Sequence, residues 1–347
     1  MGGTNIKNIN IRKLIAAVAM TTALACTAGA MISAGAPHAA AETPAPTPGQ
    51  AADLPASSPS AAPSRAPTAA EIHESAVEKL LGPRQPQLST DEKNGIINIL
   101  LIGTDERLAD SDDLGRGDVT MLCSLDKTRG TVKLVSFERS TAVPWPGHGD
   151  VMLTNSYAYG GAELTKSCVE NCFHVGINGY VHMDFEGFKD IINAIGGIDI
   201  ELTRAEAEAL TEDTYNNIWF SEGMNHLDGD GALRYCRLRR IDDNWARVAR
   251  QRTAVQAMLA KAKTLGLAEI SNPAEVLLPL IDTDLSKREL ASLLISAPKF
   301  MGAEAEQMTI PDREHIWMYD GADESVTGCN YGAESTRLRE FLYSSES

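Results

Sequence analysis

Basic residues are scarce in this sequence, and so are the short motifs that mark common enzyme classes. Lysine and arginine number 31 against 47 aspartate and glutamate residues, so the formal net charge is −16 at pH 7. Binding to a polyanion needs a net basic surface, so this balance excludes general nucleic-acid affinity and confines any anion site to a local cluster. The chain also lacks a P-loop, a nucleophile elbow and the paired-carboxylate pattern of a glycosidase. The scattered histidines, His182 among them, are predicted to be turn or surface residues.

Charge is missing altogether from residues 14–36, which follow a short positive segment, residues 1–13. A stretch of this length can span a bilayer, but the small residues at 39–41 also offer a signal-peptidase cleavage site. We therefore expect residues 14–36 to be a signal peptide or a transmembrane anchor. Either places the rest of the chain outside the cytoplasm, as a single-pass cell-membrane protein or, if cleaved, as a secreted one.

Large apolar side chains are nearly absent from residues 37–70, which consist mostly of Pro, Ala, Ser and Thr. Such a segment cannot form a core, so we predict a disordered, extended linker. The linker leads to an extracytoplasmic domain over residues 71–347.

No set of cysteines and histidines has the spacing of a zinc site. Cys168 and Cys172 are close enough in sequence to pair, but both fall in a predicted helix, where disulfide geometry is unfavourable. Cys123 and Cys236 are predicted to be small buried residues of strands.

Helices and strands are predicted to alternate from residue 96 onward, which favours a layered α/β fold with a mixed sheet. The end of the chain, residues 304–347, is ambiguous. Strands are predicted at 96–102, 119–125, 131–137, 198–202 and 233–238, and helices at 161–173, 185–195, 245–264 and 273–300.

The strands at 119–125 and 131–137 flank a five-residue turn and should form an antiparallel hairpin. If Leu125 pairs with Thr131, Asp118 lies opposite Glu138. The residues that flank the two strands then meet at the same end of the sheet.

Two carboxylates and two arginines gather at this end, namely Asp105, Arg116, Asp118 and Arg139. Carboxylate oxygens are ligands for Mg²⁺, and guanidinium groups bind phosphoryl oxygens through paired hydrogen bonds. The pattern therefore indicates a divalent cation with a phosphate. An ordinary surface salt-bridge cluster would have the same composition and stays open as the alternative.

Residues 234–252 contain seven arginines in this acidic chain. In the predicted strand, Arg237 and Arg239 point to one face. The choice of arginine over lysine favours planar, two-pronged recognition of phosphate.

The helix that follows carries Arg247, Arg250 and Gln251 on a shared face. With Asn244 as the predicted N-cap, Arg247 falls in the first turn, where a cation opposes the helix dipole unless an anion lies nearby. The alternative is a structural network in which neighbouring aspartates neutralise the arginines.

Several segments in a fixed order resemble the LytR-CpsA-Psr family, and the similarity covers approximately residues 98–265. The family implies a three-layer α/β/α sandwich with a mixed central sheet, preceded by a signal or anchor segment and a linker. The matching segments are NILLIGTDER, GRGDVTMLCSLD, VKLVSFERS, LTNSYAYGGAEL, GYVHMDFEGFKDIINAIGGIDIEL, GMNHLDGDGALRYCRLR and RVARQR.

The resemblance implies a phosphotransferase of cell-wall biogenesis. Such an enzyme moves a glycopolymer of the teichoic acid, capsule or arabinogalactan type from a polyprenyl-pyrophosphate carrier to peptidoglycan through a phosphodiester. The implied partners are the lipid-linked glycopolymer, peptidoglycan and the membrane, with no nucleic acid.

The resemblance also assigns roles to residues. Asp105 and Asp118 match aspartates associated with Mg²⁺ (or Mn²⁺), and Asp105 is the candidate base. The catalytic set is Asp105, Arg116 and Arg139, and the pyrophosphate-binding set is Arg116, Arg139, Arg237, Arg239, Arg247, Arg250 and Gln251.

Three positions depart from the family's usual pattern. Ser140 stands where the family often has aspartate, Asn244 stands where aspartate often precedes the helix arginine, and Met152 replaces a usual lysine. These departures keep two other hypotheses open: a polyprenyl-pyrophosphate hydrolase, and a non-catalytic module that binds lipid phosphate. A transcriptional regulator, a label that the family has carried, is disfavoured by the charge and the leader.

Overall fold

The structure is a computed structural model that describes residues 95–105, 115–145, 149–212, 218–264, 281–300, 303–322 and 324–344. The predicted leader and linker lie outside these residues. Within the described ranges, no helix is both long and apolar enough to cross a membrane.

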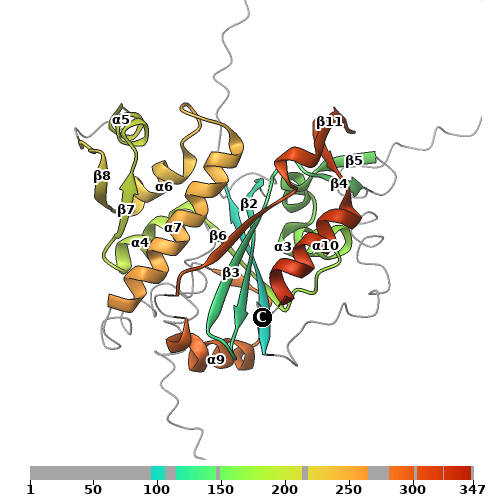
Figure 1. The fold of residues 1–347 in the computed structure, drawn as a ribbon, viewed down its shortest axis with the longest axis horizontal. Coiled ribbons are helices and arrows are strands. Elements are labelled where there is room, and N and C mark those ends of the chain that lie inside the picture. The colour runs from blue at the N-terminus through green and yellow to red at the C-terminus, as the bar shows by residue number, and fades with distance from the viewer. Residues whose placement is uncertain are drawn as a thin grey trace, which may run out of the picture.

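A six-stranded mixed sheet forms the centre of the molecule (Figure 1). In spatial order the strands are β10 (Glu306–Ile310), β3 (Thr131–Phe137), β2 (Gly117–Asp126), β1 (Ile96–Thr104), β6 (Gly179–Asp184) and β9 (Asp282–Thr283). β1 is antiparallel to β2 and parallel to β6, and β3 is antiparallel to β2 and parallel to β10.

Both faces of the sheet are covered, because every residue of β1 is buried and its side chains alternate between two cores. Ile99 and Leu101 belong to one core, and Leu100 and Ile102 belong to the other. The predicted α/β fold with a mixed central sheet is therefore confirmed, with helices on both sides of the sheet (Figure 1).

The first face packs against α4 (Phe185–Ala194), α6 (Gly229–Arg237), α7 (Asn244–Thr264) and α9 (Lys287–Ser296), and carries β7 (Ile198–Leu202), α5 (Arg204–Glu212) and β8 (Gly223–Leu227). The second face packs against α3 (Leu153–Phe173) and α10 (Tyr331–Tyr343), with β4 (Ala142–Trp145), β5 (Gly149–Met152), β11 (Ile316–Asp320) and β12 (Ser325–Cys329) at its rim. Two short 3₁₀ turns, Ala297–Lys299 and Arg313–His315, complete the described elements.

The β2–β3 hairpin forms as predicted, but its register is shifted by one residue. Leu125 pairs with Val132 rather than Thr131, and Asp126 joins β2. The Asp126 carboxylate accepts backbone hydrogen bonds from Thr128 and Arg129 at 2.7 and 2.9 Å. These bonds close a four-residue turn instead of the predicted five-residue one, so the expected pairing of Asp118 with Glu138 is wrong.

The segment predicted as a strand at 233–238 belongs to helix α6 instead. The Asp228 side chain caps this helix by accepting a hydrogen bond from the Gly231 N–H at 2.8 Å. Buried Ala232 and Cys236 recur at helical spacing. An apolar run this short fits both the two-residue period of a strand and the 3.6-residue period of a helix. The capping aspartate, Asp228, favours the helix.

The predicted helices at 161–173, 185–195 and 245–264 are confirmed in α3, α4 and α7. The first of them begins earlier, at Leu153, because α3 includes a kink at Gly160 and Gly161. The N-cap of α7 is Asp243, whose carboxylate accepts a 3.0 Å hydrogen bond from the Ala246 N–H, rather than the predicted Asn244. Of the predicted helix at 273–300, residues 273–280 lie outside the described residues, and α9 occupies part of the rest.

The five described cysteines are buried free thiols. Cys123 lies in β2 as predicted, but Cys236 lies in helix α6. Cys168 and Cys172 lie on α3 and form no disulfide, in agreement with the geometric expectation.

Candidate active site

The end of β1, the start of β2 and the end of β3 meet at one end of the sheet. Thr104 pairs with Gly117 across β1 and β2, and Thr120 pairs with Phe137 across β2 and β3. The segments next to these pairs therefore lie together. They carry four of the predicted site residues, Asp105, Arg116, Asp118 and Arg139.

Asp118 is buried and forms an ion pair with Arg139, with 3.0 Å between the Asp118 Oδ1 and Arg139 Nη2 atoms. Burial raises the pKa of the Asp118 carboxyl to about 6, although the charge of Arg139 lowers it. The charge of Asp105 raises this pKa further, whereas Arg239 and Arg116 lower it. Four of the predicted residues thus act electrostatically on one carboxylate.

Asp105 is also buried, and its carboxylate accepts a 3.0 Å hydrogen bond from the backbone N–H of Arg116. Arg116 itself is exposed. Its backbone therefore holds Asp105 in place, while its side chain is accessible to a ligand.

Asp105 and Asp118 fit a magnesium site in which the protein supplies only two ligands. In the described parts of the chain, no group of three or more Asp, Glu, His or Cys residues could hold a metal ion. Mg²⁺ commonly takes only one or two protein carboxylates and completes its shell with substrate phosphates and water. The pair suits a cation that arrives with a phosphate ligand, and Mg²⁺ stays a prediction.

Arg237 and Arg239 lie at the end of α6 and in the connection to α7, not in the predicted strand. The Arg237 guanidinium stacks over the Phe185 ring, 4.9 Å from its centroid. Burial and then the charge of Arg139 lower the pKa of Arg239, and Asp118 opposes this shift. Arg239 therefore belongs to the same electrostatic cluster as the strand-end residues.

Arg247 and Gln251 lie one turn apart on α7 and are buried. The Arg247 side chain is the largest fully buried one, with 0% exposure. All three of its guanidinium nitrogens lack a hydrogen-bond partner among the described residues, as does the Gln251 amide nitrogen. A buried, unpaired guanidinium costs several kcal/mol, so its presence points to an anion as its partner.

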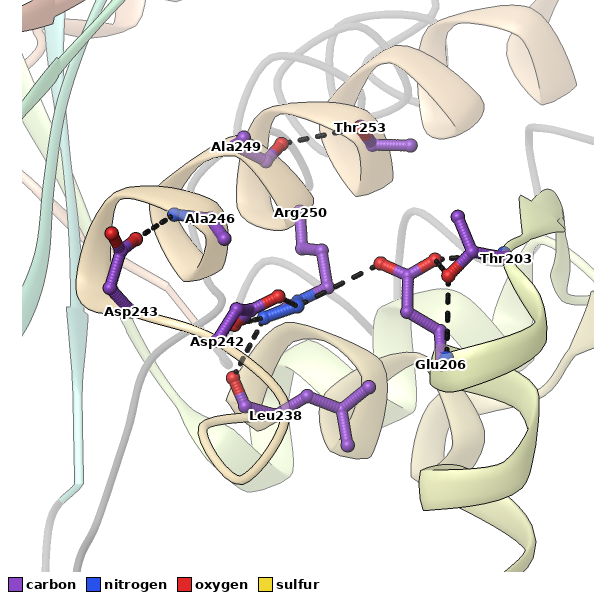
Figure 2. A network of polar contacts seen from close by, with 9 residues as sticks. All are labelled: Thr203, Glu206, Leu238, Asp242, Asp243, Ala246, Ala249, Arg250 and Thr253. Carbon is purple, nitrogen blue, oxygen red and sulfur yellow. Dashed lines mark hydrogen bonds and ion pairs between the residues drawn. The ribbon is translucent and has the colours of Figure 1, made fainter.

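Arg250 differs from Arg247, although both were predicted to face the substrate. Figure 2 shows its guanidinium between Asp242 and Glu206. It donates to an Asp242 oxygen at 2.9 Å and to the Leu238 carbonyl at 3.1 Å. The structural-network alternative therefore describes Arg250, which we leave out of the proposed site.

His182 lies inside the protein, and the prediction of a turn or surface position is wrong. It is on β6, and its Nε2 atom lies 2.9 Å from both the Thr104 and the Tyr157 hydroxyl oxygens. Burial lowers its pKa to about 4, so the ring is neutral at pH 7. Its place beside Thr104 could not be read from the sequence, because only the parallel pairing of β1 with β6 creates it.

The departures Ser140 and Asn244 meet at one residue that the sequence did not single out. Both donate hydrogen bonds to the buried Glu138 carboxylate. Met152, the third departure, pairs with Ala142 at the end of the β4–β5 ladder. The signal for Glu138 in the sequence was its adjacency to Arg139.

Comparison with known proteins identifies a family and several relatives. The profile of the LytR_cpsA_psr family matches residues 63–342. The chain is 30% identical over 278 residues to the polyisoprenyl-teichoic acid–peptidoglycan teichoic acid transferase TagU of Bacillus mycoides (strain KBAB4). This alignment covers 73% of this chain and 87% of that protein.

Solved structures share the fold. Bacillus subtilis TagV matches with a TM-score of 0.59 and 25% identity, over 73% of this chain and 99% of that one. The LytR-CPS2A-psr family protein YwtF (TagT), solved with bound octaprenyl pyrophosphate lipid, matches with a TM-score of 0.56 and 22% identity, over 75% of this chain and 98% of that one. Because the family profile covers most of the chain, the chain belongs to the LytR_cpsA_psr family.

Proposed function

We propose that this protein transfers a glycopolymer from a polyprenyl-pyrophosphate carrier to peptidoglycan. Family membership and the transferase activity in the name of its TagU relative support this function. The structural observation that carries it is the fully buried Arg247, whose guanidinium nitrogens have no hydrogen-bond partner among the described residues. Arg139 and Arg239, at the strand ends and in the α6–α7 connection, also retain one unpartnered buried nitrogen each.

The pyrophosphate group matches the charge of this cluster. In the proposed reaction, a peptidoglycan hydroxyl oxygen attacks the phosphorus that bears the glycan. The bond from this phosphorus to the bridging oxygen breaks, and polyprenyl phosphate leaves with the bonding electrons. Arg139, Arg239 and Arg247 would stabilise the negative charge that develops on the leaving phosphate, because fixed guanidinium groups need no reorganisation during the step.

The proton of the attacking hydroxyl needs an acceptor. We assign this role to Asp105, which is buried next to Arg116 and within electrostatic range of Asp118. Mg²⁺ held by Asp105 and Asp118 would supply positive charge to the phosphate oxygens. Arg116, with its accessible side chain, would bind the pyrophosphate from the open side.

The location of the reaction follows from the leader. We propose that residues 14–36 insert in the cell membrane and that the linker carries the domain outside the cytoplasm. Its lipid-linked substrate and peptidoglycan are both found there.

A transfer assay tests the function directly. The full-length protein is mixed with a lipid-pyrophosphate-linked glycan, peptidoglycan oligomers and Mg²⁺, and the products are analysed by mass spectrometry beside Arg139→Ala. We expect glycan joined to peptidoglycan through one phosphate, lost in the variant. Glycan phosphate released to water would indicate the hydrolase, and lipid binding without any product would indicate the binding module.

A further inference from the structure

Glu138 is a buried acid that the proposed reaction does not use. It follows β3 directly, and its side chain is 2% exposed. One carboxylate oxygen accepts hydrogen bonds from the Ser140 backbone N–H, at 2.8 Å, and from the Ser140 hydroxyl. The other oxygen accepts a hydrogen bond from the Asn244 side-chain amide. Every one of these donors is neutral.

Asn244 connects this carboxylate to the face of α7 that carries Arg247 and Gln251. It is the first residue of the helix, and Arg247 and Gln251 follow it at spacings of three and seven. Residues at these spacings share one helix face. Glu138 therefore binds the helix face that carries the unpaired Arg247, while its chain neighbour is Arg139.

The charges of Arg139 and Glu138 act on each other, as do those of Glu138 and Arg239, but the hydrogen bonds of Glu138 indicate a positional role. Among the described residues, Glu138 forms no ion pair, whereas Asp118 already pairs with Arg139 at 3.0 Å. Hydrogen bonds from neutral donors fix the direction of a carboxylate without cancelling its charge. Glu138 thus joins two segments that each carry an arginine of the proposed site.

Neutral residues at 140 and 244 are a condition for this arrangement. A carboxylate at either position would face a Glu138 oxygen at hydrogen-bond distance, and two carboxylates so close cannot both stay ionised. The two departures from the family pattern are therefore one coupled feature.

We propose that Glu138 is a positioning residue that fixes the start of α7 to the Arg139 segment, and that Ser140 and Asn244 are neutral because they form its binding site. The inference rests on the proposed function, since it concerns how arginines from two elements reach one pyrophosphate. With Glu138 in place, Arg139 and Arg247 approach the ligand at a fixed separation.

A double-mutant cycle in the full-length protein tests this coupling. The variants are Glu138→Ala, Ser140→Asp and the double variant, with affinity for farnesyl pyrophosphate and transfer rate as readouts. Each single variant should weaken affinity roughly tenfold. Glu138→Ala removes the carboxylate that links the two segments, and Ser140→Asp places a second carboxylate against it. The double variant should recover to within about threefold of wild type, because a carboxylate at 140 can then take the place of Glu138.

Asp126→Ala is the matched control. Asp126 is also buried, and it accepts hydrogen bonds from the Thr128 and Arg129 N–H groups at the β2–β3 turn, at the opposite end of the sheet from Glu138. Its loss should lower the melting temperature and leave affinity unchanged. The inference is overturned if Glu138→Ala behaves like this control, or if Ser140→Asp weakens affinity equally in both backgrounds. A wild type that neither binds nor transfers would overturn the proposed function itself.

Discussion

Two buried arginines on α7, Arg247 and Arg252, differ in their partners. Arg252 donates to the Gln307 side chain at 3.0 Å and to the Ser136 and Thr309 hydroxyls at 2.9 Å. Arg247 has no such acceptor among the described residues. Arg252 therefore supports the fold by joining α7 to β3 and β10, whereas the guanidinium group of Arg247 forms no hydrogen bond with the described residues.

Replacing each arginine with methionine should separate these roles. We expect Arg247→Met to raise the free energy of unfolding of the ligand-free protein by roughly 1–3 kcal/mol, because a buried unpaired charge is removed. It should also abolish binding of farnesyl pyrophosphate. Arg252→Met should lower the free energy of unfolding by about 2–4 kcal/mol, because three acceptors lose their donor. Urea unfolding and a binding titration measure both quantities.

The reverse result for Arg247 would be decisive. If Arg247→Met destabilised the protein as much as Arg252→Met, Arg247 would be part of a structural network, and the anion site would have lost its main support.

Two buried groups near the strand ends should give opposite pH dependences. The pKa of Asp118 is raised from its ordinary value of 3.8 to about 6. Between these two pH values the folded protein holds a proton on Asp118 that the unfolded chain releases, so stability falls as pH rises through this window. The lowered pKa of His182 means that the unfolded chain gains a proton between 6.5 and about 4, so stability falls as pH drops through that window. Each pKa shift corresponds to about 3 kcal/mol of unfolding free energy. The opposite pH dependences of stability that Asp118 and His182 contribute therefore nearly cancel between pH 4 and 6.

Single substitutions should reveal each slope in protein freed of divalent cations. The stability of His182→Asn should rise as pH falls from 6 to 4, and that of Asp118→Asn should decline over the same range. Burial also raises the pKa of Glu138, so Glu138 contributes a pH dependence of the same sign as that of Asp118. Urea denaturation at a series of pH values measures both. Parallel profiles for the two variants and wild type would contradict the assigned burial effects.

At the scale of the element, helix α3 contains a conformation that only glycine adopts easily. Gly161 has φ 61° and ψ −157° at the kink, and a Cβ atom there would meet nothing within 4 Å. At the other end, the C-cap His174 has φ 49° and ψ 45°, in the left-handed region that favours glycine. The kink directs the first part of α3, with Tyr157, toward His182.

Substitutions at the two ends of α3 should have opposite signs. Gly161→Ala should destabilise the protein by roughly 1–3 kcal/mol through backbone strain alone. His174→Gly should be neutral or stabilise it by up to about 1 kcal/mol, because it relieves the left-handed conformation. Melting temperatures of the two variants provide the measurement. Equal losses would show that side-chain contacts, not backbone conformation, control both positions.

At the scale of the whole molecule, the proposed anion site is a local cluster in an acidic chain, and its helix arginine is fully buried. The net charge is −16, and Arg247 has 0% exposure. The phosphate backbone of a rigid duplex cannot reach such a group. Long-range repulsion also disfavours a polyanion.

A comparison of two ligands tests this selectivity. Farnesyl pyrophosphate at 100 times its dissociation constant should stabilise the full-length protein by about 2.7 kcal/mol. Duplex DNA at physiological salt should neither bind in a shift assay nor raise the melting temperature. DNA binding that survives in Arg247→Met would revive the regulator hypothesis.

The sequence determined the fold class and much of the site, because those signals are local. Apolar runs specified β1, β2 and β3, and turn and cap residues placed their ends. The hairpin was sufficient to bring Asp118 and Arg139 together even with its register off by one residue. The order of motifs identified the family, and the leader and its membrane role stay predictions from composition.

Only the tertiary structure decided which arginines pair with acidic residues and which have no hydrogen-bond partner among the described residues. Arg247 and Arg250 look equivalent in sequence, yet Asp242 and Glu206 bind one of them and not the other. Likewise, Ser140 and Asn244 lie far apart in the chain, and their shared contact with Glu138 exists only after α7 packs against the end of β3. The physical reason is that hydrogen-bond partners and burial depend on contacts between distant segments, whereas periodicity and capping depend on neighbours along the chain.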